Sequence, residues 1–438
     1  MIVAVDMGAS SSRFCSDTGK VRVIPNNMVF LPSLDVTTLQ AEPGDIENNL
    51  EVQILKKEGK VPNGCFPTNV LVGFMANKHR DTAERPSVLE HKHNQTINYI
   101  SAIVCTALEV EKAGLKDAVV DLYLAVPPIE VVKANEVFKD GLVGKYEVKF
   151  PKYKGGITVT FEIADVSCSE ESLMATTSFF FDLNGKVREN ARQYLRGKVL
   201  SLDIGASTTD LAIIQDGRYL DKSGRTYRVG GNIARDTLNN LICERYAIDL
   251  PIEDCEKTIA EGRMQLGNGY DNVADLVDEA KRTLAKQIVQ HMQTYFKNID
   301  IPIQMINSII VSGGGSVASQ YIDENGETII TSAPMSEYVT EALQKWSPRT
   351  AVIEYGDEAR FANIKGLFIK AMLINKKKQA KLNESTGANK IQSNRSVVSF
   401  NNGTTDGKTI GATDGKAIGT PVGSSISKSA NAGGTVVL

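Results

Sequence analysis

Two short segments of the chain share a pattern that suits phosphate binding. Each is an apolar run that ends in Asp-x-Gly-Ala-Ser, from Val3 to Ser12 and from Leu200 to Thr209. The apolar residues predict a buried strand, the glycine lets a ligand approach the backbone, and the following hydroxyl and N–H groups can surround a phosphate. Each copy therefore predicts a phosphate-binding hairpin, with contacts from Gly8, Ala9, Ser10, Ser11 and Ser12 and from Gly205, Ala206, Ser207 and Thr208.

An aspartate closes each of the two predicted strands. Asp6 and Asp203 are poorly suited to packing there, but a carboxylate at a strand end can hold Mg²⁺ through the water molecules that this ion tends to keep. A single copy of the pattern is equally well explained as a strand followed by a polar turn. Its repetition favours an internally duplicated α/β protein in which the two hairpins face one metal–nucleotide complex.

With these two hairpins the chain resembles the superfamily of actin, Hsp70 and the sugar kinases. The resemblance implies an α/β, duplicated, actin-like (ribonuclease H-like) fold of two lobes, with the nucleotide in the cleft between them. The segment from Ser308 to Ser316 resembles the adenosine motif of this superfamily, in which Gly313, Gly314 and Gly315 would permit close approach of the nucleoside. Ala362 to Phe368 resembles the second connecting helix, whose small residues allow close packing on a helix of the other half.

A candidate catalytic carboxylate lies between the hairpins. Glu170 and Glu171 follow the predicted strand Thr158–Ile163, in the place of the first connecting helix. In ParM-type plasmid-segregation actins a Glu-Ser pair at this place positions the attacking water, and the match implies this role for Glu171, with Asp6 and Asp203 as its catalytic and metal-holding partners. The alternative is that two acidic residues merely stabilise a helix N-terminus.

A fifth segment, from Arg228 to Asp236, opens an amphipathic stretch. In actin relatives the corresponding segment borders the nucleotide, which implies contacts from Gly230, Gly231 and Asn232 at a helix N-terminus. Two further places, Glu261–Arg263 and Lys281, fit base or ribose contacts, but solvated helix faces explain them better.

Length and composition agree with a two-lobed protein of the cytoplasm. A chain of 438 residues exceeds one typical core, and its formal net charge of −3 gives no overall attraction to DNA or to anionic membranes. The six cysteines form no Cys-x-x-Cys pair, which favours reduced thiols over a disulfide framework or a zinc site. The first predicted strand begins at Met1, and no apolar run reaches the roughly 18 residues of a membrane span, so we expect no signal peptide and no direct membrane binding.

The predicted organisation has two lobes and a tail. Lobe I spans residues 1–196 and includes an irregular inserted subdomain at about 22–85 with one predicted strand, Glu51–Lys56. Helices are predicted at Asn98–Lys112 and Asn272–Phe296, and a strand at Leu122–Pro128. Lobe II spans 197–375.

Residues 376–438 are poor in large apolar residues and contain a small repeat at 405–419, which predicts a flexible, low-complexity tail. Nine Lys and Arg against three acidic residues make this tail basic. A solvated spacer is the favoured interpretation, and a DNA-touching arm is the less favoured one.

Function must be argued beyond the fold, since the superfamily holds kinases, chaperones and filament proteins. A chaperone of this superfamily would need a peptide-binding domain after the ATPase, whereas here a low-complexity tail follows. A sugar kinase would need a sugar-binding pocket with a catalytic Asp, and no segment of the sequence suggests one. Both interpretations are therefore disfavoured. The resemblance to ParM-type actins implies an ATPase that polymerises head to tail with Mg²⁺ and ATP, GTP being the other candidate, and segregates plasmid or phage DNA through an adaptor at a centromere-like site. The alternatives are a monomeric actin-fold ATPase switch and a sugar-kinase-like phosphotransferase.

Overall fold

The computed structural model describes residues 1–17, 19–32, 45–60, 68–79, 82–356 and 358–395. Residues 1–373 form one compact unit, and a second unit begins at Ile374. Cys65, the repeat at 405–419 and most of the predicted tail lie outside the described residues.

The first sheet contains the N-terminal hairpin. Among the described residues its strand order is β3-β2-β1-β7-β9-β8-β5-β6-β4. Strand β1 pairs antiparallel with β2 and parallel with β7, and β7 pairs parallel with β9. The bounds are β1 Ile2–Met7, β2 Ser11–Ser16, β3 Arg22–Pro25, β4 Met28–Leu31, β5 Glu51–Glu58, β6 Thr68–Val72, β7 Ala118–Val126, β8 Gly144–Phe150 and β9 Ile157–Glu170.

The second sheet repeats the central part of the first. Its order in the described chain is β12-β11-β10-β16-β19, and β13 also pairs with β11. Strand β10 pairs antiparallel with β11 and parallel with β16, and β16 pairs parallel with β19. The predicted duplication is therefore seen as one shared pattern, a hairpin followed by two parallel strands. The bounds are β10 Lys198–Ile204, β11 Thr209–Gln215, β12 Arg218–Tyr219, β13 Arg225–Tyr227, β16 Ser308–Ser312 and β19 Ala351–Glu354.

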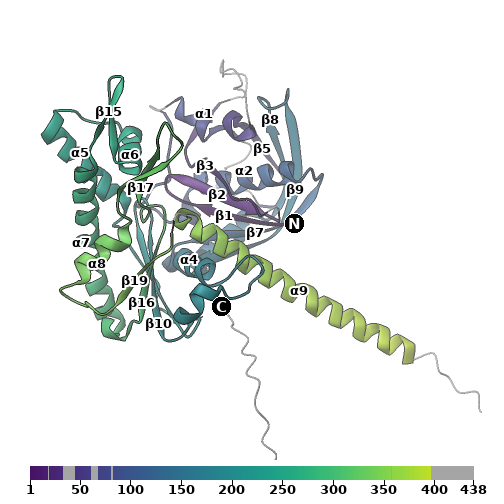
Figure 1. Cartoon of the computed structure of the whole chain (residues 1–438). Coiled ribbons are helices and arrows are strands. Elements are labelled where there is room, and N and C mark those ends of the chain that lie inside the picture. Colours follow the sequence, from purple (N-terminus) through teal and green to yellow (C-terminus); the bar gives the residue numbers. More distant parts are fainter. Residues whose placement is uncertain (18, 33–44, 61–67, 80–81, 357, 396–438) are drawn as a thin grey trace, which may run out of the picture. The chain divides into compact units, whose positions relative to one another are not determined.

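Helices cover both sheets (Figure 1). Helix α2 packs on the first sheet with an almost wholly buried apolar face, while α5 and α7 lie side by side against the second. No helix of the described residues is long and apolar enough to cross a bilayer. The helices are α1 Phe74–Asn77, α2 Thr96–Lys112, α3 Val131–Leu142, α4 Glu171–Phe180, α5 Gly231–Tyr246, α6 Ile252–Glu261, α7 Ala274–Ile299, α8 Met335–Leu343 and α9 Ala362–Arg395; two small hairpins are β14 Arg263–Leu266 with β15 Gly269–Asn272 and β17 Ser319–Ile322 with β18 Thr328–Ser332.

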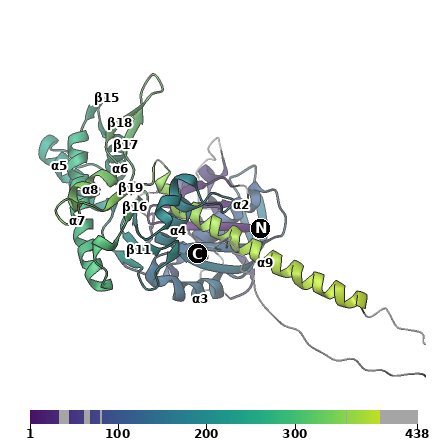
Figure 2. The ribbon, with the colours of Figure 1, turned by 60° about the horizontal axis from the view of Figure 1, so that its bottom comes forward.

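Helices α4 and α9 cross at very short range (Figure 2). A Cβ added at Gly366 would lie 1.7 Å from the carbonyl oxygen of Met174, so only a glycine permits this approach. The hydroxyl of Ser178 donates to the Ala362 carbonyl at 2.8 Å, within the same crossing. The predicted close packing of the Ala362–Phe368 segment on a helix of the other half is confirmed.

Most predicted elements appear close to their expected places. The helices predicted at Asn98–Lys112 and Asn272–Phe296 are α2 and α7, and the strands predicted at Glu51–Lys56 and Leu122–Pro128 are β5 and β7.

Two regions differ from the prediction. The described part of 22–85 is more regular than predicted, because β3, β4 and β6 belong to the first sheet together with β5. Their apolar runs are too short to predict strands from sequence, and pairing with neighbouring strands stabilises them. Helix α9 also continues past the predicted tail boundary at 376 to Arg395, since Lys, Gln, Ala and Leu residues favour helix. The predicted bounds of the lobes and of the tail stay a prediction.

The helix crossing makes a stability prediction. Replacing Gly366→Ala should lower the free energy of unfolding by about 1 to 3 kcal/mol, because the new methyl group forces α4 and α9 apart. Gly269→Ala is the control, since the nearest atom to its added Cβ is 4.0 Å away. Thermal and urea unfolding of both variants measure the effect. Alanine has a higher helix propensity than glycine, so without a steric clash the replacement would leave the stability unchanged or raise it. Such a result for Gly366→Ala would show that the crossing is not tight.

Candidate functional site

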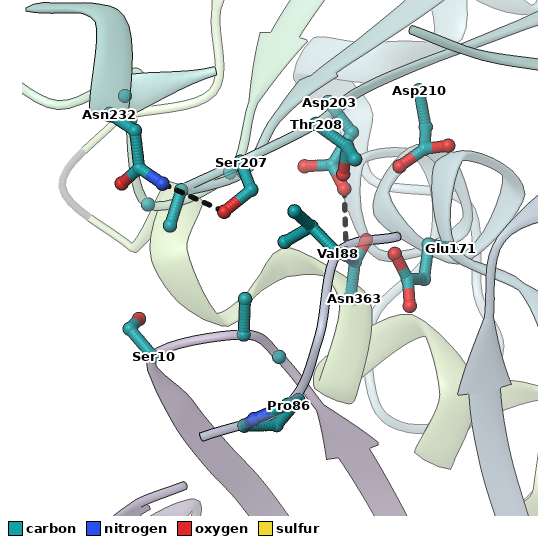
Figure 3. Close-up of a pocket in the computed structure, with 18 of the residues that line it drawn as sticks. Ser10, Pro86, Val88, Glu171, Asp203, Ser207, Thr208, Asp210, Asn232 and Asn363 are labelled. Atoms are coloured by element: carbon teal, nitrogen blue, oxygen red, sulfur yellow. Dashed lines mark hydrogen bonds between the residues drawn. The ribbon is translucent and has the colours of Figure 1, made fainter. Parts of the chain in front are cut away.

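A cavity of about 530 Å³ lies where the two hairpin turns, the turn after β16 and the starts of α4, α5 and α9 meet. The segment from Pro86 to Lys92 completes its wall. Figure 3 shows Ser10 and Ser207 from the two hairpins on this wall, with the carboxylates of Glu171, Asp203 and Asp210 gathered at one end.

The two hairpin turns are built alike. The N–H of Gly8 donates to the Ser11 carbonyl at 3.1 Å, and the N–H of Gly205 donates to the Thr208 carbonyl at 2.8 Å. A Cβ added at Gly8 would lie 2.9 Å from the Ser11 carbonyl oxygen, and one added at Gly205 would lie 3.1 Å from the Thr208 carbonyl oxygen. Both turns therefore favour glycine. Each turn thereby presents its backbone and hydroxyl groups to the cavity.

Asp6 and Asp203 end their strands at the cavity and are each only 3% exposed. Asp6 lies 3.4 Å from the guanidinium of Arg13, which is opposite it in the β1–β2 hairpin. Asp203 accepts a hydrogen bond from Asn363 at 2.7 Å (Figure 3) and another from Ser312 at 3.3 Å. Burial raises the pKa of Asp203, and the charge of Asp6 adds to that rise.

Glu171 begins helix α4 and faces the same cavity. Its carboxylate pairs with the ammonium of Lys92, while burial raises its pKa to about 7. Carboxylate oxygens of Glu171, Asp203 and Asp210 lie within 4.8 Å of one another. Burial, followed by the charge of Glu171, raises the pKa of Asp210 well above its usual value.

Glu170, which directly precedes Glu171, is not among the residues that line the described cavity. Its carboxylate instead interacts with Tyr219 through a hydrogen bond and with the charges of Lys370 and Asp221. The geometry therefore favours Glu171 over Glu170 for any chemistry in the cavity.

The glycine turns pack directly on the second hairpin. A Cβ at Gly313, where φ is +95°, would lie 2.3 Å from the Ile204 carbonyl and 2.6 Å from the Asp203 carboxylate. A Cβ at Gly230 would lie 2.8 Å from the Gly205 carbonyl. The packing of these turns on the second hairpin therefore requires glycine even without a bound ligand.

The structure brings most predicted site residues to the cavity. The lining contains Asp6, Gly8, Ala9, Ser10, Glu171, Asp203, Gly205, Ala206, Ser207, Thr208, Gly231, Asn232, Gly313, Gly314 and Gly315. Three predicted residues, Ser11, Ser12 and Gly230, are not among the described residues that line it. Ser11 and Ser12 belong to strand β2, and Ser12 is fully buried. Gly230 instead abuts the second hairpin.

Sequence reasoning missed several polar residues of the wall. Arg13 and Asp210 face the cavity from the second strand of each hairpin, opposite Asp6 and Asp203 respectively. Each directly follows its motif, so extending each motif by one residue would have included both. Lys92 reaches the site from a distant segment that no local signal marks. Asn363 belongs to the segment Ala362–Phe368, which was predicted for helix packing and not for the site.

Apolar side chains also line the cavity. Ile259, Leu284 and Met335 do so together with Lys281, and we call this set of residues the apolar slot. The ammonium of Lys281 donates to the Ala333 carbonyl at 2.8 Å, and burial lowers its pKa to about 8. Lys281 is therefore buried beside an apolar slot rather than on a solvated helix face, as suits a ring-shaped ligand.

The donor set fits a hard cation such as Mg²⁺. All the candidate ligands are oxygen atoms, which this ion prefers. The buried side-chain oxygen of Asn363, beside Asp203, lacks a hydrogen-bond partner among the described atoms. Asp6 and Asp203 are the residues that would hold the ion, and this assignment stays a prediction.

Comparisons with known proteins agree on the fold. Residues 201–321 match the family model of the C-terminal part of MreB-like archaeal actin homologues. No curated protein matches the chain by sequence. Among solved structures, the actin-like protein Alp7A is 18% identical, with a TM-score of 0.65 over 88% of this chain and 99% of its own.

Two further structures cover nearly as much. ParM of Bacillus thuringiensis with ATP is 18% identical, with a TM-score of 0.59 over 85% of this chain and 98% of its own. The archaeal actin homologue Ta0583 is 14% identical, with a TM-score of 0.58 over 85% and 99%. The chain therefore has the duplicated, two-lobed actin fold, which confirms the predicted fold class and the resemblance in fold to ParM and related actin homologues.

Proposed function

We propose that the protein is an actin-like ATPase of the cytoplasm that polymerises head to tail on binding Mg-ATP and segregates plasmid or phage DNA through an adaptor protein. One observation carries the nucleotide part of the proposal. Two matching hairpin turns, each preceded by a buried aspartate, line a single cavity with Glu171 at its carboxylate-rich end. Solved structures of similar fold contain ATP in a ParM and ADP in Ta0583, which supports nucleotide binding at the same kind of cavity.

Different residues of the cavity would bind the phosphates, hold the metal and orient the attacking water. The turns at Gly8–Ser10 and Gly205–Thr208 would hold the phosphates through N–H and hydroxyl donors. Asp6 and Asp203 would hold Mg²⁺, which when bound neutralises phosphate charge. Glu171 would orient a water whose oxygen attacks the terminal phosphorus as the bond to the bridging oxygen breaks and its electron pair leaves with ADP. The water proton passes to Glu171 and then to solvent.

Assembly would follow from the state of the cleft. A triphosphate contacts both hairpins, so its binding favours one arrangement of the two sheets and hydrolysis removes part of that preference. Head-to-tail contacts that do not close into a ring produce open filaments. A ParM of similar fold is described as a non-polymerisable mutant, which supports polymerisation as the ordinary behaviour of that relative. The adaptor would recognise a centromere-like DNA site, since the chain itself has no net positive charge.

Light scattering with parallel phosphate release tests the ATPase and filament parts of the proposal. On mixing with Mg-ATP, scattering should rise, phosphate should appear, and scattering should then decay as subunits lose their triphosphate. Mg-ADP should give no rise, and Mg-GTP measures base preference. Phosphate release without scattering at any protein concentration would contradict the filament proposal and support the monomeric switch or the phosphotransferase.

The role of Glu171 gives a second prediction. Replacing Glu171→Gln keeps a partner for Lys92 but removes the proton acceptor, so phosphate release should slow by roughly 100-fold or more. Nucleotide should still bind, and filaments should persist longer because hydrolysis no longer loosens them. Glu170→Gln is the matched control, since Glu170 does not line the described cavity. Wild-type turnover in Glu171→Gln would remove Glu171 from the mechanism.

The metal assignment gives a third prediction. Asp203→Asn should weaken binding of the ATP analogue AMPPNP by about tenfold or more when Mg²⁺ is present. Removing Mg²⁺ with EDTA should weaken binding to the wild type and change binding to the variant far less. Asp300→Asn, at an exposed helix end, serves as control. An EDTA effect of the same size in wild type and Asp203→Asn would mean that Asp203 does not hold the ion.

A further inference from the structure

Lys92 is a partly buried cation that no motif marked and that the mechanism above does not use. It begins a short 3₁₀ segment, Lys92–Asn94, just before helix α2, and lines the cavity. Its side chain is 16% exposed, and its ammonium group pairs with the Glu171 carboxylate from α4. Two segments distant in sequence thus meet at the carboxylate proposed to orient water.

The backbone of Lys92 is held from two directions. Its N–H donates to the Glu130 carboxylate at 2.8 Å, and its carbonyl accepts from the Asn98 amide at 3.0 Å. Glu130 is itself buried, and the adjacent His91 and His93 place their Nδ1 atoms 3.3 and 3.4 Å from its two oxygens. A backbone fixed in this way sets the point from which the lysine side chain reaches Glu171.

The segment before Lys92 is fixed as well. The Gln95 side chain accepts from the Ser87 N–H at 2.7 Å and donates to the carbonyls of Ser87 and Glu90 at 2.9 Å. This part of the cavity wall is therefore built by specific hydrogen bonds from the start of α2. These hydrogen bonds hold the segment in a defined conformation, so the Lys92 side chain starts from a fixed position.

The charges around Lys92 favour an ammonium group that stays protonated. Burial alone lowers its pKa, but the charges of Glu171 and Asp6 outweigh burial and raise the pKa overall. At the carboxylate-rich end of the cavity Arg13 is already 3.4 Å from Asp6. Lys92 is the cation beside the carboxylate that would orient water.

We infer that Lys92 is a catalytic residue that binds the terminal phosphate of the bound triphosphate while it holds Glu171 in place. The inference rests on the proposed function, because it takes the cavity as a triphosphate site. Glu171 must lie near the attacking water, and that water must lie next to the terminal phosphorus. Because Lys92 both pairs with Glu171 and lines the cavity, its flexible side chain would come within reach of the terminal phosphate. An ammonium group carries three donors, so it can keep its bond to Glu171 and donate to a phosphate oxygen as negative charge shifts during bond cleavage.

The test compares two variants that both lack the Glu171 charge, so that neither leaves a buried carboxylate unpaired. In one, Glu171→Gln is made alone; in the other, Lys92→Met is added to it. Affinities for AMPPNP and for ADP are measured with Mg²⁺ by calorimetry. The added Lys92→Met change should weaken AMPPNP binding by about tenfold, the effect of one charge-assisted hydrogen bond, and leave ADP binding within about twofold.

Two outcomes would overturn the inference. Equal AMPPNP affinity in the two variants would mean that Lys92 acts only on Glu171. Equal losses for AMPPNP and ADP would mean that Lys92 shapes the cavity without touching the terminal phosphate. Lys133→Met, at an exposed lysine of α3 that is paired with Glu136, should change neither affinity.

The wild type separates this failure from a failure of the proposed function. If wild-type protein binds neither nucleotide, the cavity is not a nucleotide site and both proposals fail. If wild type binds both nucleotides and the two variants do not differ, the inference on Lys92 alone fails.

Discussion

Several buried carboxylates face one cavity, and their mutual repulsion is the constraint around which this structure is organised. Asp6 and Asp203 are almost fully buried at the ends of matching strands, and Glu171 and Asp210 lie beside Asp203. Buried like charges raise one another's pKa values and disfavour folding unless cations or hydrogen-bond donors offset them. In this cavity Arg13 pairs with Asp6, Lys92 pairs with Glu171, and Asn363 donates to Asp203. A bound divalent cation would offset the same repulsion, which links metal binding to the stability of the site.

The duplicated fold explains how these carboxylates come together. In each half an antiparallel hairpin is followed by parallel strands, so equivalent turns project from equivalent sheet ends. The tight contact of Gly366 with Met174 brings α4, which carries Glu171, close to α9, which carries Asn363. Helix packing therefore positions Glu171 and Asn363, while strands β10 and β11 carry Asp203 and Asp210. Sites supported by helices and strands are held more rigidly than sites on loops alone.

The hairpins, the glycine turn and the connecting helices could be predicted because each depends on residues adjacent in sequence. Asp6 and Gly8, for example, belong to one strand and its turn, and periodicity alone indicates the helix that became α2. The role of Lys92 could not be predicted, because it depends on Glu171, which is 79 residues away in sequence and comes near only in the folded protein. The same holds for strands β4 and β6, whose short sequences become strands through pairing. Ser12 shows the opposite error, since a hydroxyl next to the motif turned out to be buried in a strand.

The most direct measurement is an experimental structure of the protein with Mg²⁺ and AMPPNP. The proposed site predicts the phosphates between the turns at Gly8–Ser10 and Gly205–Thr208, the metal between Asp6 and Asp203, and the base in the slot beside Lys281. Nucleotide density elsewhere, or an empty cavity at saturating AMPPNP, would contradict the assignment of this cavity as the site that drives assembly.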